Sequence, residues 1–148
     1  MSVFEATGEL ASERRDVWAL VAEPYHLPDW WPGYRGVQPD RRGLAADARW
    51  TVRRAPAAGF LAQASWRRPD AEGLIVITLV DPGLELRWHD VQQKIDVSLA
   101  LANAGEGGTR ATVTMDGPWW RMLPEGGREL PARSLQRLHD LCQTAADL

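Results

Sequence analysis

The stretch IDVSLALANAGEGGTRATVT, residues 95–114, carries the clearest secondary-structure signal in this chain. Apolar side chains occupy every second position from Ile95 to Leu101, which is typical of a half-buried strand. The glycine-rich segment GEGG, residues 105–108, then turns the chain back into residues 109–116. The stretch therefore predicts a β-hairpin, because a short turn of this kind joins antiparallel strands.

Similar patterns precede the hairpin and extend the predicted sheet. Residues 3–10, 48–53, 60–67 and 84–89 alternate between apolar and polar side chains. Residues 74–80 are apolar on both faces, which indicates a central strand covered on both sides. Since the turns between these segments are short, the sheet is predicted to be an antiparallel meander.

Helical patterns lie at both ends of the meander. Ser12 is the predicted N-cap of a helix over residues 13–22, and residues 25–31 predict a second short helix. A C-terminal helix is indicated by leucines that share one stripe with the only cysteine, which is expected to be a buried apolar residue: Leu135, Leu138, Leu141 and Cys142. Prolines interrupt the approach to this helix, so residues 119–130 are predicted to be either a kinked helix or a loop.

The composition limits the classes of protein to which this chain can belong. A length of 148 residues is that of one ordinary domain, so residues 1–148 are expected to form a single domain. Seventeen basic against twenty acidic residues argue against a nucleic-acid binder. One cysteine excludes an intrachain disulfide, and the histidines lack metal-ligand spacing, so no metal or cofactor is expected. Without a secretory signal or a membrane-length apolar run, we expect a cytoplasmic protein without stable membrane insertion; the oligomeric state stays open.

Tryptophan is the unusual component: the chain has eight, with only two tyrosines and two phenylalanines. Indoles are wide and flat, and each carries an N–H that needs an acceptor when it is buried. Such side chains indicate a roomy interior that suits an apolar or aromatic ligand. The alternative is that they simply fill a large core, which explains several of them equally well.

Four local motifs, in order along the chain, resemble those of a known superfamily. They are RDVWALV (residues 15–21), LPDWWPG (27–33), GGTRATV (107–113) and the closing leucine stripe (135–142). Their order is similar to that of the START-like, or SRPBCC, superfamily, and in particular to its polyketide cyclase/dehydrase and lipid-transport branch. The resemblance spans nearly the whole chain.

The resemblance implies an α+β helix-grip fold. In it a curved antiparallel sheet of about seven strands wraps around the C-terminal helix, two short helices follow the first strand, and a deep cavity lies between sheet and helix. This sequence differs from the usual helix-grip pattern in one respect. Up to seven strand-like stretches follow the helix pair, where the fold usually has six strands. Either residues 50–54 and 60–67 form one bent strand or extended hairpin, or one short stretch is a loop.

Candidate site residues follow from the aromatic content and from the implied cavity. A pocket of about 300–1,000 Å³ is expected, and its predicted ligand-binding residues are Trp30, Trp31, Tyr34, Trp50, Trp66, Trp88, Trp119 and Trp120. Polar side chains on the strands are candidates for contact with a ligand in the cavity: Gln63, Ser65, Thr78, His89, Asp96, Ser98 and Thr114. Of these, His89 and Asp96 are the weak candidates for a catalytic role by proton transfer.

Three functions remain open from the sequence. The first is binding of a small-to-medium hydrophobic, aromatic or polycyclic, ligand in a central cavity. The second is a cyclase/dehydratase-type enzyme that acts on a polyketide-like substrate, which would need a pair of polar groups within hydrogen-bond reach inside the pocket. The third is a protein-interaction module that presents its paired tryptophans on the surface.

Overall fold

The computed structural model describes residues 2–55, 72–122, 127 and 129–146. In this part of the chain seven strands form one antiparallel sheet, in the order β1-β7-β6-β5-β4-β3-β2. The strands are β1 (Ser2–Leu10), β2 (Tyr34–Gln38), β3 (Arg49–Arg54), β4 (Glu72–Asp81), β5 (Glu85–Asp90), β6 (Ile95–Ala104) and β7 (Gly108–Gly117). The helices are α1 (Arg14–Ala22), η1 (Pro24–His26), α2 (Leu27–Trp30), α4 (Trp119–Met122) and α5 (Glu129–Ala146).

The predicted hairpin is confirmed as the pairing of β6 with β7, which runs from Asp96 opposite Asp116 to Ala104 opposite Gly108. Its turn places Gly105 and Gly107 at φ values of 58° and 72°. This left-handed conformation is strained for residues with a Cβ, so the turn needs glycine at both positions. The hairpin therefore forms where the sequence predicts it.

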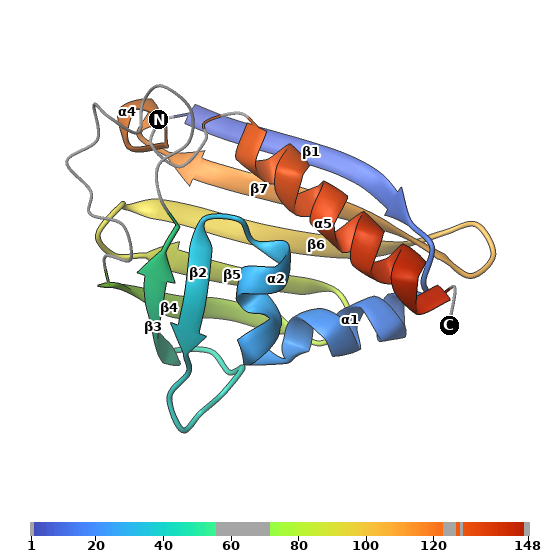
Figure 1. The fold of residues 1–148 in the computed structure, drawn as a ribbon, viewed down its shortest axis with the longest axis horizontal. Coiled ribbons are helices and arrows are strands. Elements are labelled where there is room, and N and C mark those ends of the chain that lie inside the picture. The colour runs from blue at the N-terminus through green and yellow to red at the C-terminus, as the bar shows by residue number, and fades with distance from the viewer. Residues whose placement is uncertain (1, 56–71, 123–126, 128, 147–148) are drawn as a thin grey trace.

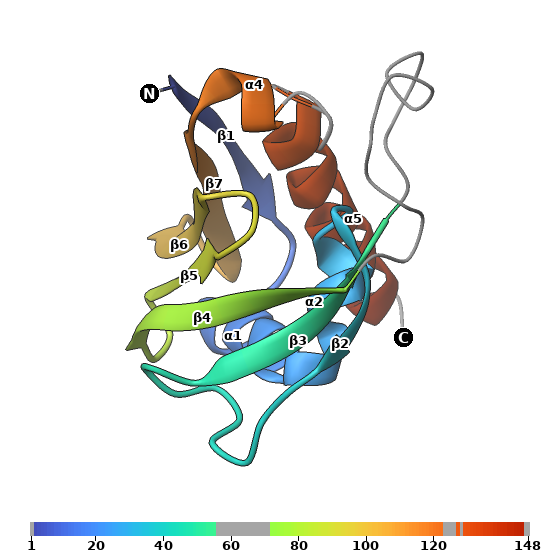
Figure 2. The ribbon, with the colours of Figure 1, turned by 90° about the vertical axis from the view of Figure 1, so that its left-hand side faces the viewer.

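The sheet curves, and its concave face holds α5 (Figures 1 and 2). The helix packs against β1 and β7, while α2 packs against β2 and against α5 itself. Leu138 and Cys142 are buried on the predicted stripe, and Leu135 and Leu141 are partly buried against the same core. The predicted α+β architecture, with a curved sheet around the C-terminal helix, is thus confirmed.

The structure confirms some of the local secondary-structure predictions and contradicts others. The second short helix is present as η1 and α2, but β2 was not predicted. Ser12 is not the N-cap of α1, because Glu13 takes that position and the Ser12 carbonyl instead accepts a hydrogen bond from the Thr109 hydroxyl at 2.7 Å. Of residues 119–130, the first four form the short helix α4. The strand-like stretch 60–67 lies outside the described residues, so the choice between a bent strand and a hairpin stays a prediction.

Replacing Leu138 with Ala should lower the free energy of unfolding by about 2–5 kcal/mol, because its fully buried side chain fills the contact between α5 and the sheet. Chemical denaturation measures this loss. Arg133→Ala, at an exposed position of the same helix, is the matched control and should change stability by less than about 0.5 kcal/mol. Equal losses for both variants would contradict the packing described for α5.

Candidate functional site

Four aromatic side chains meet between the concave face of the sheet and α2. Trp30 ends α2, Trp31 follows it, and Pro32 and Gly33 lead the chain into β2, which begins at Tyr34. Trp88 comes from β5, where strand alternation turns it inward. Trp88 stands edge-on to Trp30 and to Trp31, with ring centroids 5.7 and 5.5 Å apart, and lies 6.4 Å from the Tyr34 ring. The motif WWPGY thus supplies three of the four rings of this aromatic cluster.

A small cavity adjoins the aromatic cluster and has a volume of about 10 Å³. Its lining is mostly apolar: Trp31, Tyr34, Asp90, Ile95, Val97, Met115 and Leu130. The space beside the aromatic cluster is thus much smaller than the predicted pocket of about 300–1,000 Å³. Other hollows lined by described residues, of about 400–480 Å³, are open grooves on the surface.

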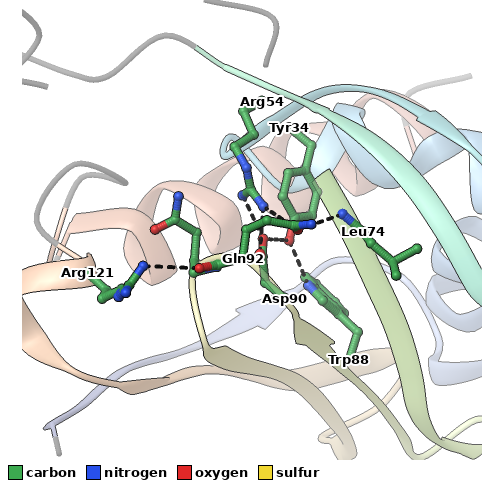
Figure 3. Close-up of polar contacts among 8 residues, drawn as sticks. Tyr34, Arg54, Leu74, Trp88, Asp90, Gln92 and Arg121 are labelled. Atoms are coloured by element: carbon green, nitrogen blue, oxygen red, sulfur yellow. Dashed lines mark hydrogen bonds and ion pairs between the residues drawn. The ribbon is translucent and has the colours of Figure 1, made fainter. Parts of the chain in front are cut away.

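A buried ion pair forms the polar wall of this cavity (Figure 3). The Arg54 guanidinium donates to both carboxylate oxygens of Asp90, with Nη1–Oδ2 at 2.7 Å and Nη2–Oδ1 at 2.6 Å. The two side chains are only 2% and 5% exposed. Both lie at strand ends, where the inward positions of β3 and β5 finish. The bidentate geometry fixes the distance between these two strand ends.

Tyr34 and Trp88 extend this pair into a network. The Tyr34 hydroxyl donates to Asp90 Oδ2 at 2.8 Å and accepts the Trp88 indole N–H at 3.1 Å. The Gln93 backbone N–H donates to Asp90 Oδ1 at 3.1 Å, so the carboxylate accepts four hydrogen bonds in all. Burial, with a smaller contribution from the Asp90 charge, raises the pKa of Tyr34 well above its usual value of 10.0. The phenol is therefore a hydrogen-bond donor at neutral pH and not a base.

The turn after β5 connects this network to α4. The Gln92 side-chain oxygen accepts the Leu74 backbone N–H at 2.8 Å and lies 3.5 Å from Arg54 Nη2, while the Gln92 carbonyl accepts from Arg121 Nη1 at 3.1 Å. Arg54 also needs the glycine at position 73, because a Cβ there would collide with its guanidinium. Gly73 in β4 thus makes room for the buried charge.

Arg54 and Asp90 are not among the predicted site residues, although the sequence contains a signal for their inward direction. Alternation that turns Trp50 and Val52 inward also turns Arg54 inward, and the same period carries Trp88 to Asp90. An arginine and an aspartate at inward positions of two strands of one sheet are expected to pair, because a buried charge needs a partner.

The predicted ligand-binding residues separate into three groups. Trp30, Trp31, Tyr34 and Trp88 come together in the aromatic cluster. Trp50 is buried but has another role, since its indole N–H donates to the Gly43 carbonyl at 2.9 Å and holds the loop before β3. Trp119 and Trp120 are 54% and 56% exposed and contact each other on α4, and Trp66 lies outside the described residues.

One buried polar side-chain atom takes part in none of these hydrogen bonds. The indole nitrogen of Trp30 is buried and has no hydrogen-bond partner within the described residues. The Trp30 carbonyl, by contrast, accepts the Ser134 hydroxyl of α5 at 2.7 Å. The backbone of this residue is therefore fixed while its side-chain N–H stays unpaired.

The polar strand candidates that belong to the described residues lie on the outer face of the sheet. His89 Nδ1 and Asp96 Oδ1 are 2.9 Å apart, but their side chains are 37% and 61% exposed. The hypothesis that this pair acts inside the cavity is wrong, because the inward positions of their strands belong to Trp88 and Val97. Thr78, Ser98 and Thr114 line a groove on that same outer face, while Gln63 and Ser65 are outside the described residues.

Two features are absent from the parts of the chain that the structure describes. No three side chains of the metal-ligating types gather into a group that could hold a metal ion. None of the described helices is both long and apolar enough to cross a membrane.

Asp90→Asn should lower the free energy of unfolding by about 3–5 kcal/mol, because it removes the carboxylate charge that faces the buried Arg54 guanidinium. Urea denaturation measures the loss. The double variant Arg54→Met/Asp90→Asn removes both charges, so it should be more stable than Asp90→Asn alone. If the double variant is instead the less stable of the two, the cost does not come from an uncompensated charge.

Comparison with known proteins adds information on the fold. No family model matches the chain, and no curated protein matches it in sequence. Solved structures do match. XoxI from Bacillus cereus is 9% identical, with a TM-score of 0.73 and 99% of each chain covered. A START superfamily protein from Mycobacterium smegmatis is 13% identical, with a TM-score of 0.70 over 97% of this chain and 98% of that one.

The KanY protein is similar to this chain to about the same degree. It is 15% identical, with a TM-score of 0.67 over 96% of this chain and 97% of the KanY chain. At such low identities the likeness concerns the fold and not the chemistry. The structural likeness covers nearly the whole length of this chain and of each matched chain. The resemblance in sequence motifs also spans nearly the whole of this chain. The chain therefore has the START-like, helix-grip fold.

Proposed function

We propose that this chain is a single ligand-binding domain that takes up a small hydrophobic, aromatic molecule between the concave face of its sheet and α5. The observation that carries the proposal is the aromatic cluster beside an interior cavity with one polar wall. Ligand sites are commonly apolar and aromatic, with a few polar groups that set the orientation. The START-like fold supports the same proposal, because this superfamily commonly binds hydrophobic ligands.

The size of the cavity determines how a ligand would enter. A cavity of about 10 Å³ accommodates no aromatic ring, so a bound ligand must displace a side chain. Trp31 is the side chain best placed to move, because it lines the cavity and makes ring contacts but no side-chain hydrogen bond within the described residues. Tyr34 and Trp88 are held by the Asp90 network and would stay as fixed walls.

The polar wall favours binding over acid–base catalysis. The Asp90 carboxylate already accepts four hydrogen bonds, and the raised pKa of Tyr34 keeps its phenol protonated. Neither group is a free base. His89 and Asp96, the pair considered for a cyclase/dehydratase reaction, are on the outer face. The described interior thus offers fixed polar contacts to a ligand and no poised proton acceptor.

Titration with naphthalene should quench the tryptophan fluorescence of the wild-type protein saturably, because Trp31 lines the cavity and Trp30 and Trp88 belong to the same aromatic cluster. Trp31→Ala should lower stability by about 3–5 kcal/mol. The same substitution should raise naphthalene affinity by about tenfold, which corresponds to about 1.4 kcal/mol, since no indole then has to be displaced. Trp50→Phe, outside the aromatic cluster, is the control and should leave the affinity unchanged. Absence of saturable binding to both wild type and Trp31→Ala would refute the proposal.

A second function is favoured by a different observation. Trp119 and Trp120 are both more than half exposed and form an apolar pair on α4. Exposed apolar patches mark interaction sites, so we propose protein binding through α4 as the second candidate.

Replacing both Trp119 and Trp120 with Ser tests this candidate. Stability should change by less than about 0.5 kcal/mol per site, because neither ring is part of the core. A partner that co-purifies with the wild-type protein should be lost from the double variant, while naphthalene binding is retained. Equal recovery of the same partners with both proteins would exclude α4 as the docking site.

A further inference from the structure

The Trp31 ring occupies the space that a ligand would need. It lines the cavity, and the residue is only 2% exposed. The ring stands edge-on to Trp88, with centroids 5.5 Å apart, and lies 6.5 Å from the Tyr34 ring at a tilt of 55°. The backbone of Trp31 is fixed, because its N–H donates to the Leu27 carbonyl at 2.8 Å and its carbonyl accepts the Tyr34 N–H at 3.3 Å. Movement is therefore limited to the side chain, which can turn to another staggered rotamer.

Most other side chains that line the cavity are held more firmly than Trp31. Tyr34 and Asp90 are tied to each other by the hydrogen-bond network. Ile95 and Val97 are β-branched, so their side chains are stiff, and they lie on β6, which pairs with a strand on each side. Leu130 is buried in the first turn of α5. None of these side chains leaves its place as easily as one that only ring packing holds.

Met115 is the second adaptable side chain of the lining. It is buried on β7, which pairs with β1 and with β6, so the position of its Cβ is fixed. Its three rotatable bonds let it follow the edge of a ligand. The space that opens for a ligand is therefore that of the Trp31 indole together with the small cavity beside it.

We infer that Trp31 is an internal substitute for the ligand, and that the site takes a flat molecule of two fused aromatic rings in place of its indole. The inference rests on the proposed function and narrows the class of ligand. Such a molecule has the outline of the displaced indole and would keep its edge-on contact with Trp88. A single ring would leave part of the space empty, and a third ring would collide with side chains that are held in place. Because both an empty space and overpacking cost free energy, affinity should be greatest at two rings.

The test compares the affinities of benzene, naphthalene and phenanthrene, which have one, two and three fused rings. In an apolar site without a size limit, affinity rises with each ring, because more apolar surface is buried. Here naphthalene should bind at least about tenfold more tightly than either of the others. The same order should hold for Trp31→Ala, since the space left by the indole sets the same limit. In that variant, nuclear Overhauser contacts should connect bound naphthalene with the Trp88 and Tyr34 rings, as expected for a ligand in the place of the indole.

Met115→Ala should relax the size limit, because it shortens a side chain that lines the cavity. Phenanthrene should then bind within about threefold of naphthalene. Leu99→Ala is the matched control. It shortens a buried aliphatic side chain on β6 that is not one of the described lining residues, so it should keep the preference for two rings.

The outcomes separate the inference from the proposed function. If phenanthrene binds both wild type and Trp31→Ala at least as tightly as naphthalene does, the inference is wrong although the proposed function stands. This comparison decides by itself if Met115→Ala does not fold. If naphthalene binds neither wild type nor Trp31→Ala, the proposed function fails and the inference fails with it.

Discussion

The buried ion pair between Arg54 and Asp90 is the interaction on which the arrangement of the interior depends. Moving both charges out of water is costly, and the structure offsets this with bidentate geometry and with hydrogen bonds to the remaining carboxylate lone pairs. Those bonds come from β2, from β3 and from the turn after β5. One carboxylate therefore sets the relative positions of three segments that are far apart in the chain.

The ion pair also determines which side chains of the proposed site are held in place. Tyr34 and Trp88 are held by hydrogen bonds to or through Asp90, whereas Trp31 is held by ring packing and Trp30 by packing and its backbone. The proposed site thus combines side chains that hydrogen bonds hold in place with an indole, Trp31, that only ring packing holds. A rigid wall beside an adjustable one suits the binding of a compact, flat ligand better than chemistry that needs a free base.

The two faces of the sheet differ in the polarity of their side chains. In β5, β6 and β7 most apolar side chains lie on the concave face and most polar side chains lie on the outer face. His89 and Asp96 pair with each other across two strands on that outer face. Their proximity is real, but it is remote from the aromatic cluster, because neighbouring positions of a strand point to opposite sides.

The sequence by itself determined the first strand, the two helices after it, the β6–β7 hairpin, the buried stripe of α5 and the resemblance to the START-like superfamily. All of these depend on local periodicity and turn chemistry, which a linear pattern contains. Even the inward direction of Arg54 and Asp90 can be read from strand alternation. Only the tertiary structure decided that these two charges meet and that the cavity beside the aromatic cluster has a volume of about 10 Å³. These properties depend on contacts between segments distant in sequence, and on the volumes that their side chains fill together.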